Sequence, residues 1–125
     1  MIFDTDILIW VQRGNKKAAH LIDKTEERSI SMLTYMELLQ CPSSKAMQKL
    51  TKDFLKEFDF EMLPITERIC HRAAIYIEEH SLATGLRAGD AIVAATAVEH
   101  NLPLITGNKK HFQIVQGLQL KAFGP

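Results

Sequence analysis

The sequence contains only two cysteines, Cys41 and Cys70, among its 125 residues. Two isolated thiols cannot form the disulfide framework of a small secreted protein or a cysteine-based metal site, so we expect both to be free in a reducing cytosol. A single domain of this length buries roughly two-thirds of its unfolded surface and can fold without such crosslinks. No internal repeat, linker or low-complexity tract divides the chain.

The chain also lacks a long apolar run and a basic N-terminal segment. A membrane-spanning helix needs about 20 consecutive, mostly apolar residues, and a signal peptide begins with a positively charged region. Asp4 interrupts the apolar start of this chain. We therefore predict no membrane association and a cytoplasmic location.

An excess of charge of either sign is missing as well, because 15 Lys and Arg residues balance 15 Asp and Glu residues. This balance argues against a broadly basic protein that coats nucleic acid. A local basic rim could still attract phosphates. Its candidates, which could equally be ordinary solvated surface, are Arg13, Lys16, Lys17, Arg87, Lys109 and Lys110.

What the chain does contain is an alternation of short apolar segments with amphipathic helical patterns. Strands are predicted at about 1–4, 29–33, 60–65, 103–105 and 118–123. Helices are predicted at about 6–13, 16–24, 34–40, 66–79 and 90–100, and from a cap at Ser43 or Ser44 to about Phe58. Loops are expected at 80–89 and 107–112. This order predicts an α/β fold with a mostly parallel sheet covered by helices, and Pro64 favours an edge position for the third strand.

Four oxygen-bearing side chains lie beside these apolar segments: Asp4, Glu37, Asp90 and Asn108. Carboxylates are rarely buried unless they are paired or bind a metal. Asp4 ends the first predicted strand, Glu37 and Asn108 lie just past the ends of two others, and Asp90 begins a predicted helix. Ligands of parallel sheets bind beyond the carboxyl ends of the strands. We therefore predict that all four converge on one edge of the sheet and form an acidic pocket.

Most of these residues also have a simpler structural interpretation. Glu37 fits a helix-capping box that starts at Thr34. Asp90 could be a helix N-cap, and Asn108 could be an ordinary turn residue. Asp4, at the end of a buried strand, has no comparable explanation.

In these residues the sequence resembles a PIN domain, and most closely a VapC-type toxin of a toxin–antitoxin system. The resemblance covers nearly the whole chain and implies a single domain, 1–125, with a three-layer α/β/α fold. It also implies a divalent-metal-dependent endoribonuclease, often a homodimer, that is neutralised by a cognate antitoxin protein. The motifs that carry it are Ile2-Phe3-Asp4-Thr5-Asp6, Thr34-Tyr35-Met36-Glu37-Leu38, 89–97, and Leu104-Ile105-Thr106-Gly107-Asn108 followed by Phe112.

By position, Asp4, Glu37 and Asp90 match the acidic site residues of this family. Hard oxygen ligands without His or Cys at ligand spacing favour Mg²⁺ or Mn²⁺ over Zn²⁺. We expect Asp4 and Asp90 to anchor the main metal, and Glu37 to support it or to orient a bound water. Thr5 and Thr106 could hydrogen-bond to these ligands.

The chain departs from the family pattern at two positions. Asn108 stands where many members carry a fourth acid, and His111 stands where a further acid often precedes the phenylalanine. Both changes reduce the negative charge, so we expect one metal rather than two, with Asn108 as a neutral helper in the catalytic site. Asp6 is expected to cap a helix and could restore part of the missing charge.

Two other functions remain open from the sequence. Residues 1–6 also resemble the start of haloacid-dehalogenase-like phosphatases, in which Asp4 would be the nucleophile and Asp6 a general acid. Against this, Ala94 stands where that family usually has a second acid, and no cap insertion follows residue 8. The second alternative is a non-catalytic PIN-like module that only binds a partner, which the neutral residues at positions 108 and 111 would permit.

Overall fold

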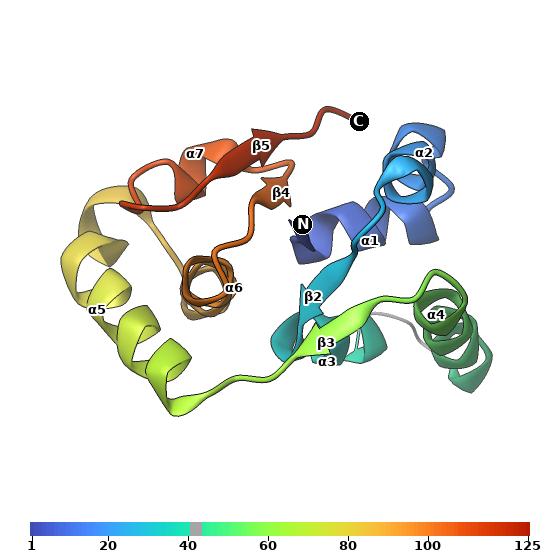
Figure 1. Ribbon diagram of the computed structural model, residues 1–125, viewed down its shortest axis with the longest axis horizontal. Coiled ribbons are helices and arrows are strands. Elements are labelled where there is room, and N and C mark those ends of the chain that lie inside the picture. The colour runs from blue at the N-terminus through green and yellow to red at the C-terminus, as the bar shows by residue number, and fades with distance from the viewer. Residues whose placement is uncertain (41–43) are drawn as a thin grey trace.

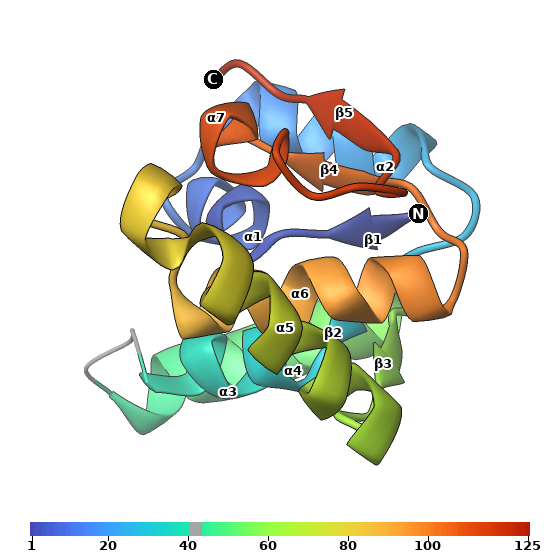
Figure 2. The same cartoon turned by 90° about the vertical axis from the view of Figure 1, so that its left-hand side faces the viewer.

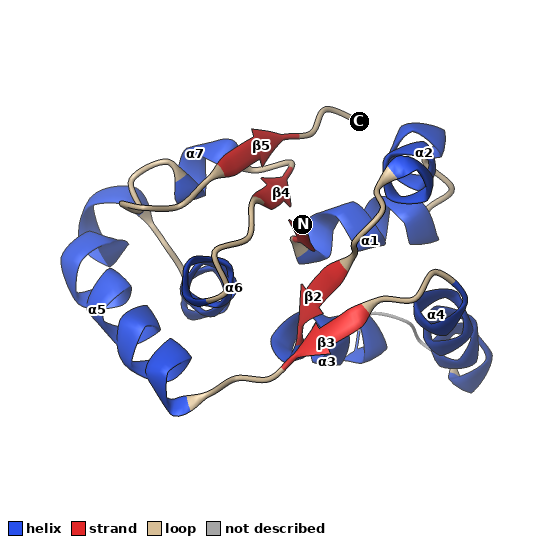
Figure 3. Ribbon diagram, viewed as in Figure 1, coloured by secondary structure: helices blue, strands red, loops and turns tan. Residues whose placement is uncertain are grey.

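The sheet is fully parallel. The computed structural model describes residues 1–40 and 44–125, so Cys41 and the alternative cap Ser43 lie outside the described residues. The five strands of the described part form one sheet in the order β3-β2-β1-β4-β5, and each neighbouring pair is parallel (Figure 3). The strands are β1 Ile2–Phe3, β2 Ser29–Ser31, β3 Glu61–Leu63, β4 Leu104–Thr106 and β5 Leu120–Ala122. The predicted parallel sheet is confirmed, and the strand before Pro64 lies at an edge as predicted.

The helices begin mostly at the predicted caps. Side-chain oxygens of Asn15, Ser44 and Thr66 accept the backbone N–H three residues further on, and so start α2, α4 and α5. No helix in the described part of the chain is long and apolar enough to cross a bilayer. The helices are α1 Thr5–Gln12, α2 Lys16–Lys24, α3 Met32–Gln40, α4 Lys45–Glu57, α5 Glu67–Thr84, α6 Ala88–Glu99 and α7 Lys109–Phe112 (Figure 1).

Two hydrophobic cores cover the two faces of the sheet. Successive side chains of a strand point to opposite faces, so Ile2 packs with α5 and α6 whereas Phe3 packs with helices α1 to α4. Leu104 and Ile105 of β4 divide between the two cores in the same way. Figures 1 and 2 show α5 and α6 packed together on one side of the sheet and α1, α2 and α4 on the other. The predicted three-layer α/β/α fold is therefore confirmed.

Helix α5 is longer than predicted. It runs to Thr84 and ends at Gly85, which adopts the left-handed conformation (φ +73°) that favours glycine. The predicted helix ended near residue 79. The last turns of α5 do not continue its buried apolar face, because Leu82 there is fully exposed. The predicted loop at 80–89 is therefore wrong in its first half, since neither glycine nor proline interrupts the helix there.

Candidate active site

The order of the strands fixes where the site lies. From β1 the chain moves to β2 and β3 on one side, and it then crosses back to β4 on the other side of β1. In open parallel sheets, ligands bind at the carboxyl ends of the strands beside such a reversal. A cleft of about 260 Å³ lies at this point. Its lining residues are Asp4, Thr5, Asp6, Ile9, Glu37, Gly89, Asp90, Val93 and Asn108. The structure thus brings the four predicted site residues together.

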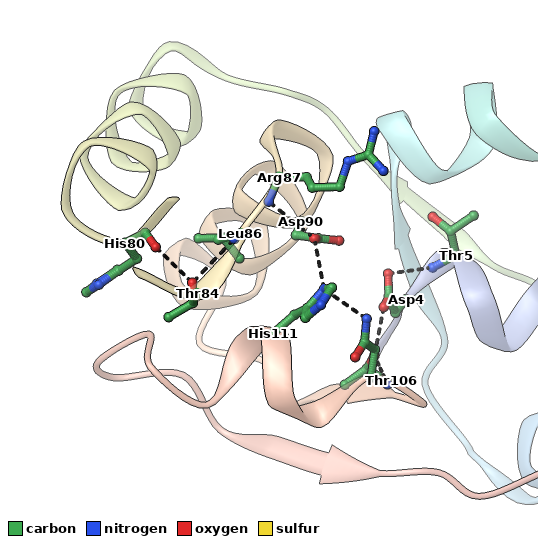
Figure 4. Close-up of polar contacts among 10 residues, drawn as sticks. Asp4, Thr5, His80, Thr84, Leu86, Arg87, Asp90, Thr106 and His111 are labelled. Carbon is green, nitrogen blue, oxygen red and sulfur yellow. Dashed lines mark hydrogen bonds and ion pairs between the residues drawn. The ribbon is translucent and has the colours of Figure 1, made fainter. Parts of the chain in front are cut away.

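Asp4 links the ends of the adjacent strands β1 and β4. Asp4 is only 8% exposed to solvent. One carboxylate oxygen accepts the Thr5 N–H at 2.8 Å, and the other accepts the Thr106 hydroxyl at 2.7 Å (Figure 4). Burial, together with the nearby carboxylates of Asp6 and Asp90, raises the pKa of Asp4 to about 7, although both hydrogen bonds oppose the shift. Asp4 is also the N-cap of α1, a structural role that the sequence analysis did not assign to it.

Glu37 is held by a chain of hydroxyls. The Thr5 hydroxyl lies 2.6 Å from Glu37 Oε1 and 3.0 Å from the Thr34 hydroxyl. Thr5 has one hydroxyl proton and a carboxylate can only accept, so Thr5 donates to Glu37 and Thr34 donates to Thr5. The predicted capping box is wrong, because α3 begins at Met32 and Thr34 is a buried residue of its first turn.

Asp90 lines the cleft from the first turn of α6. Helix α6 begins at Ala88, so Asp90 is its third residue and not the N-cap, but its side chain still takes part in capping by accepting the Arg87 N–H. Asp90 Oδ2 lies 3.4 Å from the Arg87 backbone nitrogen and 3.6 Å from His111 Nδ1 (Figure 4). The bond from the Arg87 N–H is long, so it holds the carboxylate weakly and leaves it available to a ligand.

Asn108 reaches Asp4 indirectly. Its backbone N–H donates at 2.9 Å to the Thr106 hydroxyl, which in turn donates to Asp4. The Asn108 amide nitrogen lies 2.9 Å from His111 Nδ1, and an amide NH₂ can only donate, so His111 carries its proton on Nε2 in this arrangement. Asn108 is the N-cap residue of α7, a short helix where a loop or turn was expected.

Asp6 differs from its prediction. It is the second residue of α1 and not its cap. Its Oδ2 accepts the Gly107 N–H at 2.9 Å, whereas its buried Oδ1 has no hydrogen-bond partner among the described residues. Burial raises the pKa of Asp6, and Asp90 adds to the increase. The pairing of Asp6 with Gly107 was not predicted, and its only signal in the sequence is a glycine directly after a buried strand.

The residues of the cleft fit a hard divalent cation. Across 1–40 and 44–125, no three Asp, Glu, His or Cys side chains are grouped closely enough to form a ready-made ligand set. The donors are nevertheless carboxylate oxygens. Burial, with the neighbouring carboxylates adding to it, raises the pKa of Asp4 and Asp6, and the buried Asp6 Oδ1 is unpaired among the described residues. A cation that keeps part of its water shell, as Mg²⁺ does, would relieve this excess of negative charge.

Comparison with known protein families identifies the fold. The family model described as "PIN domain" matches residues 1–118, which is most of the chain. The chain belongs to the PIN domain family.

Solved structures resemble this PIN domain over nearly its full length. A toxin–antitoxin complex from Klebsiella pneumoniae contains a chain that is 30% identical, with a TM-score of 0.79 and coverage of 94% of this chain and 93% of that one. VapBC2 from Rickettsia felis, bound to a promoter DNA fragment, is 20% identical, with a TM-score of 0.77 and coverage of 99% and 100%. VapBC-1 from nontypeable Haemophilus influenzae is 22% identical, with a TM-score of 0.76 and coverage of 98% of each chain. Comparison with curated proteins gave no match.

The family assignment also decides between the enzyme classes left open by the sequence. A PIN domain is a different family from the haloacid-dehalogenase-like phosphatases. In addition, Ala94 is fully buried within α6, and α1 follows Asp4 directly. The structure therefore gives no support to Asp4 as a phosphatase nucleophile.

Proposed function

We propose that this PIN domain is the toxin of a toxin–antitoxin system and that it hydrolyses phosphodiester bonds of RNA as an Mg²⁺- or Mn²⁺-dependent endoribonuclease. The observation that carries this proposal is the convergence of Asp4, Glu37, Asp90 and Asn108 on one cleft at the carboxyl ends of the strands. Membership of the PIN family and the similarity to chains of toxin–antitoxin complexes support it.

The proposed roles follow from the hydrogen bonds of each side chain. Asp4, Asp90 and Glu37 would hold the cation. When bound, the ion would lower the pKa of a water molecule and neutralise charge on the phosphate. Thr106 and the Thr5 N–H orient the Asp4 carboxylate, and the Thr5 hydroxyl orients Glu37. Asn108 supports Asp4 through Thr106.

Basic side chains on either side of the cleft support an RNA substrate. Lys109 and Lys110 directly follow Asn108, and Arg87 lies one turn before Asp90; all three are exposed. Cations at the rim can bind the flanking phosphates of a chain whose scissile bond lies at the acidic centre. An RNA substrate would also imply action in the cytoplasm.

The antitoxin would bind to a separate surface. An apolar groove of about 360 Å³ lies between α1, α3 and α4, and Leu50 within it is 62% exposed. Such an apolar surface suits an amphipathic segment of a partner protein. Its apolar lining residues are Leu8, Val11, Leu38, Met47, Leu50, Phe54 and Leu55.

The decisive experiment compares the wild type with Asp4→Asn. Purified wild type should cleave RNA with Mg²⁺ or Mn²⁺ and lose this activity in EDTA. Asp4→Asn should remove cleavage in vitro and growth arrest in vivo, while its circular dichroism stays unchanged. Equal cleavage by the two proteins would contradict the nuclease proposal and favour the non-catalytic module. We also propose a homodimer, which light scattering of the purified protein would test.

A further inference from the structure

Asp6 is an additional carboxylate of the cleft to which the roles above assign no function. It lines the cleft together with Asp4, Glu37 and Asp90. Its two oxygens have different surroundings. Oδ2 accepts the Gly107 N–H at 2.9 Å, whereas Oδ1 is buried and has no hydrogen-bond partner in the described part of the chain.

The turn after β4 is shaped to receive this carboxylate. A Cβ atom at position 107 would lie 2.8 Å from Asp6 Oδ2 and 3.6 Å from its Cγ. Any side chain there would therefore push the carboxylate away, and only glycine allows the contact. The neighbours of Gly107 are Thr106, which donates to Asp4, and Asn108, which lines the cleft. Asp6 is thus fixed against the segment that carries other parts of the site.

A buried carboxylate oxygen without a partner is costly. Because Gly107 occupies Oδ2, Oδ1 is the oxygen left for a ligand. We propose that Asp6 is the fourth acid of the metal site: Gly107 fixes one oxygen, and the other supplies negative charge to the bound cation, directly or through a water. In this way Asp6 offsets the neutral residues at positions 108 and 111. This inference rests on the proposed metal-dependent function.

A purely structural role for Asp6 would be to hold the Gly107 turn in place, and two substitutions separate the two roles. Asp6→Asn keeps the size of the side chain and an oxygen that can accept the Gly107 N–H, but it removes the charge. Asp6→Ala removes both. The matched control is Asp23→Asn, because Asp23 is an exposed residue of α2 that does not line the cleft.

The test measures Mn²⁺ binding by calorimetry without RNA, together with melting temperatures in EDTA. We expect Asp6→Asn to bind Mn²⁺ about ten- to a hundredfold more weakly than the wild type, with no fall in its melting temperature. Gly107→Ala should weaken Mn²⁺ binding similarly, because its methyl group displaces the carboxylate. Asp23→Asn should bind as the wild type does.

Two results would overturn the inference in distinguishable ways. If the wild type binds Mn²⁺ and Asp6→Asn binds it within about twofold, Asp6 only positions the turn and the proposed nuclease function stands. If the wild type itself binds no Mn²⁺, the metal-dependent function fails and the inference fails with it.

Discussion

The acidic cleft and the apolar groove are two hollows of comparable size with opposite chemistry. The cleft measures about 260 Å³ and has four carboxylates in its lining. The groove measures about 360 Å³ and is lined mainly by aliphatic and aromatic side chains of three helices, with a few polar residues such as Asp53 and Glu57. In the cleft, hydrogen bonds from distant segments orient the side chains, such as the bond between Thr106 and Asp4. In the groove, exposed apolar residues such as Leu50 are simply left uncovered. Chemistry and partner binding should therefore be separable by mutation.

The largest effect is expected in the cleft. Asp90→Asn should lower the rate of RNA cleavage about a thousandfold, because the neutral amide holds the cation poorly. Antitoxin affinity should remain within about twofold of the wild type, since Asp90 does not line the groove. A fluorescent RNA assay and calorimetry with the antitoxin measure the two quantities. If Asp90→Asn lost both RNA cleavage and antitoxin binding, the acidic cleft and the apolar groove would be coupled.

A substitution in the groove is expected to have the opposite effect, so that antitoxin binding is lost and RNA cleavage is kept. Leu50→Asp should weaken antitoxin binding at least about thirtyfold, because a charge enters the apolar surface, while RNA cleavage stays unchanged. Calorimetry with the cognate antitoxin provides the measurement. Leu82→Asp is the matched control, since Leu82 is fully exposed on α5 and lies outside the groove. Normal antitoxin binding by Leu50→Asp would move the antitoxin to another surface.

The stability of the metal-free protein should depend on pH through the cleft. The pKa of Asp4 is about 7 in the folded protein and 3.8 in its unperturbed form, so the folded state binds more protons between these values. The free energy of unfolding should therefore fall as pH rises from 4 to 8, by up to about 4 kcal/mol from this group. Urea unfolding in EDTA measures the slope. Asp4→Asn should flatten it, and an equal slope in that variant would refute the assignment.

The smallest effect is expected from the N-cap of α4, the helix that supplies most of the groove residues. Ser44→Ala removes the hydroxyl that accepts the Met47 N–H at 3.2 Å and should lower the free energy of unfolding by about 1 kcal/mol. Mn²⁺ binding should not change, because α4 does not line the cleft. Thr66→Ala, which uncaps α5, is the control for a cap remote from the groove. A changed Mn²⁺ affinity in Ser44→Ala would mean that the cleft depends on the groove.

Much of the fold could be predicted because the relevant signals are local. Apolar runs, the caps Asn15 and Thr66, and Pro64 act within a few residues, and each predicted feature is present. The wrong predictions occur where one local sequence pattern is compatible with two different structures. Thr34 and Glu37 have the spacing of a capping box, but the helix starts earlier and their side chains meet Thr5 instead. Only contacts with another segment could decide between them.

The sequence alone determined the fold class and the chemistry of the cleft, because periodicity and residue type do not depend on distant neighbours. The tertiary structure decided how each oxygen is used. It placed Thr106 against Asp4 across 102 positions and Gly107 against Asp6 across 101. Such pairings depend on the register of β1 with β4, in which Phe3 lies beside Ile105. Only the folded sheet creates that register, so Asp6, expected to be a helix cap, became an acid with one oxygen anchored and the other free.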